Sequence, residues 1–219
     1  MRIVFIALAA SILLFSCKQK EQTTGKPADT VTAVMDSTLV TDSTWGPINA
    51  NTTIDSLKAI YGAENIKDER VCGPECADSI DVTFIYRDSP RQITVNWMDS
   101  FYHKKISFLE TWDSASPYHT DKNIKAGSTM RELVKLNGKK ISFSGFGWDY
   151  GGFVQEFHGG TLDKSNIGYR LDMKEWNGAD SLVGDIGLDT DMPVVQRALD
   201  NIIVYYISLT LHRPVYNEY

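Results

Sequence analysis

The 219-residue chain contains three cysteines, and the first of them has the most informative surroundings. Cys17 comes shortly after residues 3–15, a run that is apolar except for one serine. Such a run is too short to span about 30 Å of hydrocarbon as a helix, and it has the length of the apolar region of a secretory signal peptide. We therefore expect residues 1–16 to be a signal peptide and Cys17 to begin the mature protein.

The residues Leu14-Phe15-Ser16-Cys17 resemble the lipobox of bacterial lipoproteins, which signal peptidase II cleaves before the cysteine. The resemblance implies that the Cys17 thiol receives a diacylglycerol group and anchors the protein in a membrane. In Gram-negative lipoproteins an aspartate after the cysteine retains the protein at the inner membrane, whereas this chain has Lys18. The resemblance therefore implies a lipid-anchored protein of the outer membrane, facing the periplasm or the cell surface. The alternative is an ordinary secretory signal that ends in a cysteine by chance.

Cys72 and Cys76 enclose the sequence Gly-Pro-Glu. The segment resembles the redox-active Cys-Gly-Pro-Cys of thioredoxins, but it has one extra residue. A redox-active cysteine also needs a helix N-terminus to lower its pKa, whereas the residues after Cys76 alternate like a strand. Because two thiols that remain in an oxidising compartment pair readily, we expect a structural disulfide that closes a tight loop.

Other arrangements that could support metal binding or catalysis are weak. None of the four histidines has a second ligand at the i, i+4 spacing of zinc sites: His103, His119, His158 and His212. Three aspartates lie close together without the spacing of an EF-hand: Asp185, Asp189 and Asp191. Asp149 and Glu156 could serve a hydrolase, but carboxylates are common in so acidic a chain. We therefore expect no catalytic residues, no metal site and no cofactor.

The segment 145–160 is the remaining candidate site, since its six glycines are interleaved with large aromatic residues. Glycine in a strand often marks a bend or the close approach of another backbone. In a structural interpretation, the aromatic rings fill the space that the glycines leave. In a functional interpretation, Trp148, Tyr150 and Phe153 offer flat faces to a sugar ring or to a partner, and Asp149 accepts a hydrogen bond.

Charge and composition narrow the class of protein. The chain has 22 Lys+Arg and 28 Asp+Glu, a net charge of −6, and only two adjacent basic pairs, which argues against nucleic acid as a partner. Residues 17–44 are polar, contain no aromatic residue and show no sustained apolar period. These features predict a flexible tether. The whole chain is 42% hydrophobic, which is typical of globular proteins, and residues 45–219 are expected to form one folded domain.

The folded part contains an internal repeat with an offset of 76 residues. Residues 48–62 align without gaps on residues 124–138. Each copy has the signals of one short helix, over residues 54–61 and 130–137. In the second copy Thr129 and Glu132 have the spacing of a capping box, and in the first copy Thr53 or its neighbour is the N-cap. A glycine follows each helix where a left-handed residue commonly ends one: Gly62 and Gly138.

Alternating apolar and polar residues predict strands after each helix. These strands cover residues 80–86, 93–97, 106–112, 140–148, 153–157, 167–173 and 202–211. A turn or short helix is expected to start at Asp191-Met192-Pro193, because proline is favoured at the first helical position. Hairpin strands with two short helices predict an α+β fold, a single domain built from two tandem units.

The tandem order of a Ser/Thr-capped short helix, a glycine and antiparallel strands resembles the β-lactamase-inhibitor-like and outer-membrane-assembly small-lipoprotein group. Residues 48–62 and 124–138 carry the resemblance, together with the strand order. The resemblance implies an α+β binding module without catalysis, and it transfers no individual residue.

Two functions remain open. The first is a membrane-anchored, non-enzymatic envelope lipoprotein that binds a protein or an envelope component. The second is a glycan-binding or glycan-processing surface lipoprotein that uses segment 145–160. A clustered aromatic face with a groove would favour the second function, and a buried aromatic hairpin beside a flat exposed sheet would favour the first.

Overall fold

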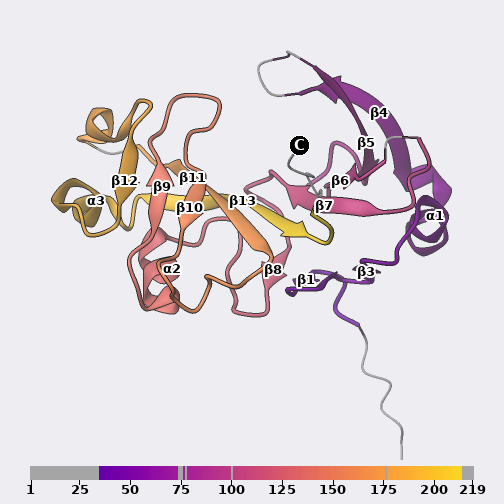
Figure 1. Ribbon diagram of the computed structural model, residues 1–219, viewed down its shortest axis with the longest axis horizontal. Coiled ribbons are helices and arrows are strands. Elements are labelled where there is room, and N and C mark those ends of the chain that lie inside the picture. The colour runs from indigo at the N-terminus through magenta and orange to yellow at the C-terminus, as the bar shows by residue number, and fades with distance from the viewer. Residues whose placement is uncertain (1–34, 74–75, 77, 100, 176, 214–219) are drawn as a thin grey trace, which may run out of the picture. The chain divides into compact units, whose positions relative to one another are not determined.

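The computed structural model describes residues 35–73, 76, 78–99, 101–175 and 177–213. The predicted signal peptide, Cys17 and the first part of the predicted tether lie outside the described residues. In the part of the chain that is described, no helix is long and apolar enough to cross a membrane. The chain from Met35 onward forms one compact unit of short helices and mainly antiparallel strands, which confirms the predicted α+β class (Figure 1).

A six-stranded antiparallel sheet forms the centre of this unit, with the strand order β11-β13-β7-β6-β5-β4. Its strands are β4 (Ile66–Cys72), β5 (Ser79–Ile85), β6 (Ile93–Trp97), β7 (Ile106–Thr111), β11 (Ile167–Met173) and β13 (Ile202–Thr210). The first repeat supplies β4 to β7, and the second supplies β11 and β13. Because β7 pairs with β13, the two repeats share one sheet.

Two smaller sheets flank the large one, with the orders β3-β2-β1-β8 and β10-β9-β12. Their strands are β1 (Leu39–Val40), β2 (Thr44–Trp45), β3 (Ile48–Asn49), β8 (His119–Thr120), β9 (Ser142–Ser144), β10 (Val154–Glu156) and β12 (Gly187–Asp189). An isolated bridge between Phe153 and Arg170 brings the β9–β10 hairpin beside β11. The series β9-β10-β11-β13 of the second repeat therefore matches β4-β5-β6-β7 of the first.

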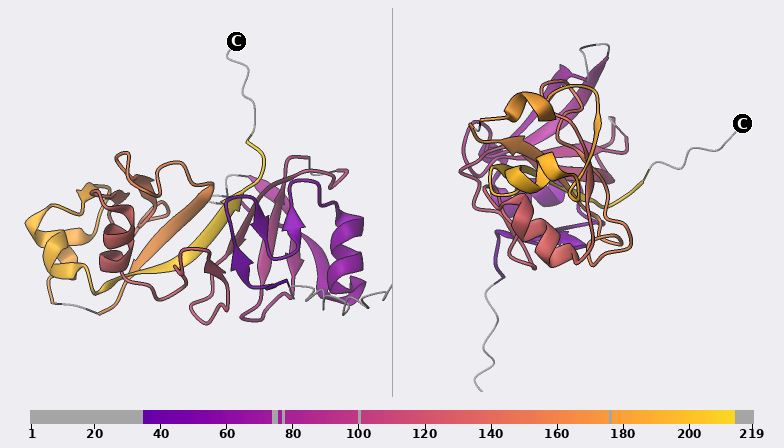
Figure 2. Two further views of the ribbon diagram at one scale, coloured as in Figure 1. Left: turned by 90° about the horizontal axis from the view of Figure 1, so that it is seen from below. Right: turned by 90° about the vertical axis from the view of Figure 1, so that its left-hand side faces the viewer.

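Both predicted helices form with the predicted bounds, as α1 (Ile54–Tyr61) and α2 (Met130–Asn137). At α2 the predicted capping box is present: Thr129 Oγ1 accepts a hydrogen bond from the backbone N of Glu132 (3.3 Å), and Glu132 Oε2 accepts one from the backbone N of Thr129 (2.6 Å). Figure 2 shows α1 beside the strands of the first repeat and α2 beside those of the second.

The repeat also extends to the hydrogen bonds that precede each helix. Thr52 Oγ1 accepts from the backbone N of Asn49 (3.0 Å), and Ser128 Oγ accepts from the backbone N of Lys125 (3.2 Å), at positions 76 residues apart. The helix ends differ. Gly138 follows α2 in the left-handed conformation (φ 70°, ψ 5°), as predicted. Gly62 has φ 85° but ψ 135°, because the chain turns there into the 3-10 helix η1 (Ala63–Asn65).

The hydrophobic core lies on one face of the large sheet. Leu57 of α1 and Leu133 of α2 are fully buried there. The third helix, α3 (Pro193–Ala198), begins at the predicted proline, and the 3-10 helix η3 (Ala179–Leu182) precedes it. Along β13 the core residues are Ile202, Val204, Ile207 and Leu209. Tyr206 is buried as well, where the pairing of β13 with β11 shifts in register. The opposite face of the sheet carries polar and aromatic side chains together with Ile80 and Val82.

The folded part begins earlier than the sequence predicts, so the expectation of a tether over residues 17–44 is wrong for residues 35–44. Strand β1 pairs with β2 and with β8, and Val40 is fully buried. A two-residue strand gives no periodic signal, and its parallel partner His119–Thr120 is distant in sequence. The sequence between Cys17 and Met35 lies outside the described residues.

The predicted strand over residues 140–148 is also shorter than expected, since β9 covers only Ser142–Ser144. Gly145 and Phe146 leave the ladder of β9 with β10. Their backbone N–H groups donate instead to Ile186 O (2.7 Å) and Leu182 O (2.9 Å). Residues 145–153 therefore form a loop whose first residues are held by segment 182–186.

Candidate functional site

The loop 145–153 lies against the edge strand β11, and its glycines permit this close approach. A Cβ atom at Gly152 would lie 2.1 Å from the carbonyl oxygen of Leu171, and one at Gly145 would lie 2.6 Å from that of Gly184. Gly152 also has a positive φ of 77°, which glycine adopts with little cost. These contacts support the structural interpretation of the glycines in this segment.

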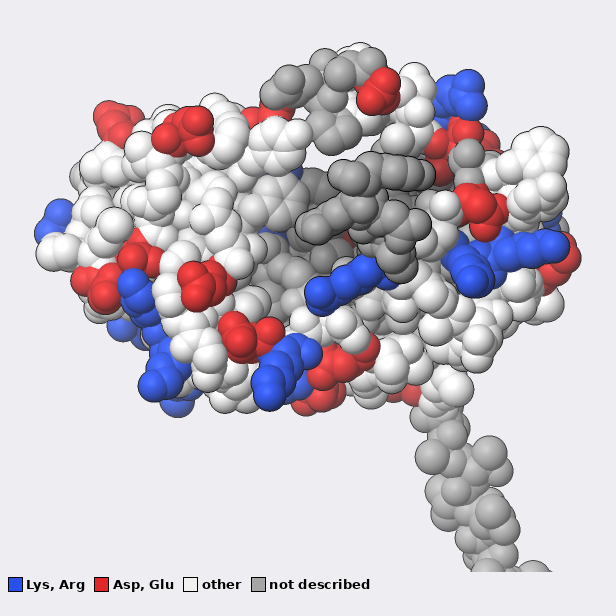
Figure 3. All heavy atoms as spheres, viewed as in Figure 1, with Lys and Arg blue, Asp and Glu red and all other residues white. Residues whose placement is uncertain are grey.

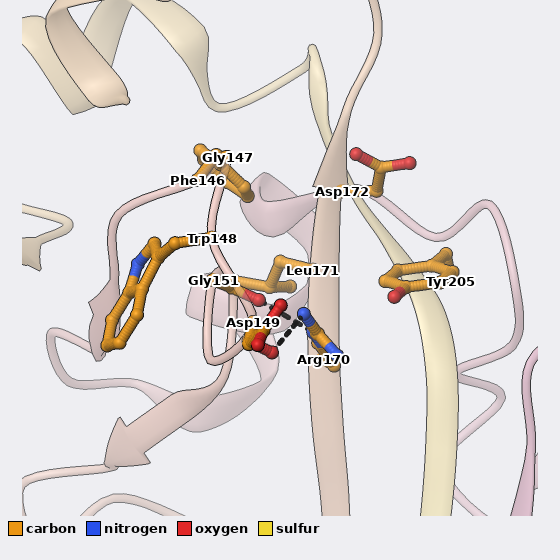
Figure 4. A pocket seen from close by; sticks show the side chains of 9 residues that line it. All are labelled: Phe146, Gly147, Trp148, Asp149, Gly151, Arg170, Leu171, Asp172 and Tyr205. Atoms are coloured by element: carbon orange, nitrogen blue, oxygen red, sulfur yellow. Dashed lines mark hydrogen bonds between the residues drawn. The ribbon is translucent and has the colours of Figure 1, made fainter. Parts of the chain in front are cut away.

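Arg170 of β11 fixes the loop from the other side. Its Nε donates to the carbonyl oxygen of Gly151 (2.6 Å), and its Nη2 donates to that of Asp149 (2.8 Å), as Figure 4 shows. A guanidinium group offers five donors in a rigid plane, so two backbone carbonyls orient it firmly. The loop is thus held in one position relative to the sheet.

Aromatic rings surround the same guanidinium group. The Cζ atom of Arg170 lies 4.6 Å from the ring centroid of Phe153 and 5.4 Å from that of Trp112, which is within the range of cation–π contacts. The Trp112 ring lies 4.3 Å from Tyr206 and 5.7 Å from Tyr205, centroid to centroid. The sheet face away from the core therefore carries a connected aromatic cluster around one arginine.

A cavity of about 530 Å³ opens beside this cluster, and we call it the aromatic cavity. Its lining combines apolar and aromatic groups with a few polar ones: Cys72, Gly73, Cys76, Ile80, Asn96, Phe108, Glu110, Trp112, Asp149, Tyr150, Phe153 and Arg170. One part of the lining comes from Cys72, Gly73 and Cys76, and another comes from the loop between β9 and β10. Gly73 and Asp149 are 76 residues apart, which equals the offset of the repeat.

Glu110 is the most unusual polar group of the cavity. Its Oε1 accepts from Asn96 Nδ2 (3.1 Å) and its Oε2 accepts from the hydroxyl of Tyr206 (2.9 Å). Burial raises the pKa of Glu110, and these hydrogen bonds offset the increase in part. Burial and the nearby Glu110 carboxyl also raise the pKa of Tyr206, so this hydroxyl remains a donor. A half-buried, oriented carboxyl thus lies next to aromatic rings.

The raised pKa of Glu110 predicts a pH dependence of stability. The folded protein binds the Glu110 proton more tightly than the unfolded chain does, so this group favours folding below its unfolded-state pKa of about 4.3, and the advantage is lost as the pH rises through the folded-state pKa. Glu110→Gln keeps a neutral acceptor for Tyr206. Urea unfolding should show a smaller loss of stability from about pH 4 to neutral pH in this variant than in the wild type.

A matched control for this prediction is Glu175→Gln, which changes an exposed carboxylate. It should leave the pH dependence of the unfolding free energy unchanged. Identical pH profiles of the wild type and Glu110→Gln would contradict the raised pKa of Glu110.

The structure separates the predicted binding residues. Asp149, Tyr150 and Phe153 line the aromatic cavity, but Trp148 does not. Trp148 lines a neighbouring pocket of about 410 Å³ together with Asp149 and Arg170, and its Nε1 donates to Gly145 O (2.8 Å). In Figure 4 its ring points away from Arg170 and Tyr205. Trp148 is half-buried, and its ring packs against that of Tyr150 with 5.6 Å between centroids.

Cys72 and Cys76 form the expected disulfide, with their Cα atoms 4.8 Å apart, and both line the aromatic cavity. Sequence reasoning missed the other principal residues of the cavity, Glu110, Trp112 and Arg170. Glu110 and Arg170 occupy polar positions of alternating strands, where an exposed charge is the ordinary expectation. Only the pairing of β7 with β13 and of β13 with β11 brings them together.

A second polar cluster crosses the sheet β10-β9-β12. His158 Nε2 lies 2.6 Å from Ser142 Oγ, and His158 Nδ1 lies 3.3 Å from Glu156 Oε1, the order of groups that activates a nucleophilic serine. However, the Ser142 hydroxyl donates to Asp189, which Lys140 also binds (2.9 Å). The serine proton is thus directed away from the histidine, and the cluster is a cross-strand polar network. Among the described residues, no group of histidines, cysteines and acidic residues could hold a metal ion.

No protein-family model and no curated protein matches the chain. Among solved structures, the chain is similar to the crystal structure of the uncharacterized protein yfeY from Escherichia coli, with a TM-score of 0.46 and 17% sequence identity over 79% of this chain and 99% of that one. A similarity of this size carries no conclusion on function.

Proposed function

We propose that the chain is an envelope lipoprotein, anchored in the outer membrane through Cys17, whose folded part is a non-enzymatic binding module. The observation that carries the binding function is the aromatic cavity: about 530 Å³ with polar groups at fixed positions, among them Glu110 and Arg170. Binding sites for small molecules are concave and mostly apolar, with a few oriented polar groups, and this cavity has that composition. The signal-peptide pattern and the lipobox-like residues support the anchor.

The ligand class that fits the cavity best is a glycan. The C–H face of a sugar ring packs on aromatic rings such as Trp112 and Tyr150, whose side chains are 40% and 46% exposed. Its hydroxyl groups suit planar polar side chains, and Asn96, Glu110 and Arg170 supply an amide, a carboxyl and a guanidinium group. A clustered aromatic face with a cavity is the feature that distinguishes a glycan-binding module from a module for a protein partner.

The binding function is tested by titrating the purified protein with defined glycans: oligomers of N-acetylglucosamine, muropeptides and lipopolysaccharide core oligosaccharides. Calorimetry and intrinsic tryptophan fluorescence report binding. Trp112→Ala and Tyr150→Ala should each weaken binding of the active glycan by at least about tenfold, since each removes an aromatic face from a desolvated contact worth about 1–3 kcal/mol.

Trp148→Ala is the comparison variant, because Trp148 lies on the same loop but lines the neighbouring pocket and not the aromatic cavity. Because its ring packs on Tyr150, it should weaken glycan binding somewhat, but less than Tyr150→Ala does. Absence of binding to every glycan, combined with a protein partner captured from the envelope and lost in Trp112→Ala, would replace the glycan by a protein. Equal effects of Trp112→Ala and Trp148→Ala on binding would move the site to the neighbouring pocket.

The anchor is tested separately by Cys17→Ala. This change removes the only atom that the lipid could attach to, so the protein should leave the membrane fraction or stay unprocessed with residues 1–16 attached. Fractionation and mass spectrometry of the N-terminal peptide measure both results. Lipid labelling of Cys17→Ala at the wild-type level would contradict the proposal.

A further inference from the structure

The connection between β6 and β7 exposes large apolar side chains that do not line the aromatic cavity. Phe101 is 84% exposed, more than any other large apolar side chain in the described part of the chain, and Tyr102 beside it is 63% exposed. Met98 at the start of the connection is 38% exposed. We call these three residues the aromatic tip. Each of them leaves apolar surface in water, and such exposure often marks a contact site.

The base of the connection is well held, so the exposed rings are not the result of a loose chain end. The backbone N of Met98 donates to Lys105 O (2.8 Å), and the backbone N of Tyr102 donates to Asp99 Oδ1 (2.6 Å). The His103 ring stacks on Trp97 with 4.9 Å between centroids and 7° between planes. Since the base is fixed in this way, Phe101 and Tyr102 are kept away from the core.

Two lysines follow the aromatic tip in a chain that is acidic overall, and Asp99 lies within the tip. Lys104 Nζ lies 5.3 Å from the ring centroid of Tyr102, and Lys105 beside it is exposed. The other adjacent basic pair of the sequence contains Lys140, which is bound to Asp189 (2.9 Å). No ion pair of Lys104 or Lys105 occurs within the described part of the chain. On the face that Figure 3 shows, acidic and basic side chains are interspersed without a broad patch of one sign.

We propose that the aromatic tip inserts into the head-group region of the phospholipid bilayer that holds the lipid of Cys17, with Lys104 and Lys105 next to lipid phosphates. This inference rests on the proposed anchor. Aromatic rings beside lysines are the usual composition of protein segments at the membrane interface. A stable protein–protein interface needs about 800 Å² from each partner. The tip consists of three apolar side chains on a narrow turn and is too small for such an interface.

The distance from the anchor permits this contact. Residues 18–34 separate the lipidated cysteine from the first described residue, and a chain of this length spans at most about 60 Å. The folded part is thus confined near the bilayer surface, where weak contacts become effective because the tip does not have to find the membrane by diffusion. The lipid and the tip together provide the two attachments that stable membrane association generally requires.

The experiment uses the protein purified from membranes and reconstituted into vesicles of phosphatidylethanolamine and phosphatidylglycerol with brominated acyl chains. Bromine quenches tryptophan fluorescence only at close range, so Phe101→Trp reports whether position 101 enters the bilayer. Tyr150→Trp is the matched control, since it places an indole on an exposed ring position of the aromatic cavity. Difference spectra against the wild type isolate each new indole. Quenching at position 101 should be severalfold stronger than at position 150.

Mass spectrometry of the same samples establishes whether Cys17 carries lipid, so the two proposals fail independently. If lipid is present and positions 101 and 150 are quenched equally, the tip does not enter the bilayer. If lipid is missing, co-sedimentation decides: binding of the protein to the same vesicles that is lost in the double variant Phe101→Ser, Tyr102→Ser supports the tip, and unchanged sedimentation of that variant overturns it. A protein captured through these two residues, without vesicle contact, would also overturn it.

Discussion

Gly152→Ala should destabilise the folded part by about 3 kcal/mol or more. The added Cβ would lie 2.1 Å from the carbonyl oxygen of Leu171, and backbone atoms cannot move aside as a flexible side chain can. A positive φ adds about 1 kcal/mol for any residue with a side chain. Relief of the clash breaks the hydrogen bond from Leu171 N to Gly152 O (2.8 Å) and moves the wall of the aromatic cavity. Chemical unfolding gives the change in free energy, and glycan titration gives the loss of binding.

Gly159→Ala provides a matched control for this variant. Gly159 also has a positive φ, of 70°, but no heavy atom lies within 4 Å of the position of its Cβ. The loss of stability in Gly159→Ala should therefore be limited to the backbone cost of about 1 kcal/mol. Equal losses at the two positions would show that conformation, and not contact with β11, determines the requirement for glycine at position 152.

The helices of this fold could be predicted from the sequence because their signals are local. The bounds 54–61 and 130–137 follow from a threonine cap, an i, i+3 apolar stripe and a terminal glycine within eleven residues of sequence. The strands with long alternation, such as Ile93–Trp97 and Ile167–Met173, were predictable for the same reason. The two-residue strands β1 to β3 and β8 have no period to detect. β1, β2 and β3 pair with one another as neighbours in sequence, and only the pairing of β1 with β8 joins segments far apart in the chain.

The candidate site could be predicted only in part. Glycines among aromatic residues identify the loop 145–153, and Asp149, Tyr150 and Phe153 of this loop do line the aromatic cavity. Glu110 and Arg170 were not predictable, because the cavity forms where strands of the two repeats become neighbours in one sheet. Sequence spacing within either repeat contains no information on that juxtaposition.

A single buried asparagine at the end of α2 binds the segment that follows β10. Asn137 is 2% exposed. Its Nδ2 lies within hydrogen-bond distance of three backbone carbonyls, those of Lys139 (3.1 Å), Lys140 (3.3 Å) and Phe157 (2.9 Å), and its Oδ1 accepts from the backbone N of Leu162 (3.1 Å). No residue of the first repeat suggests this role, since the aligned position there is Tyr61.

Asn137→Ala should therefore cost about 3–5 kcal/mol, because each buried backbone group left without its partner costs about 1–3 kcal/mol. The melting temperature should fall by roughly 10 °C for a unit of this size. Lys135→Ala on the same helix is the control, since Lys135 is exposed and its replacement should change stability by less than about 0.5 kcal/mol. If Asn137→Ala melted within about 2 °C of the wild type, a shift of under 1 kcal/mol, water would be able to replace all four hydrogen bonds. The end of α2 would then be held by apolar contacts such as that of Leu133, and not by the amide.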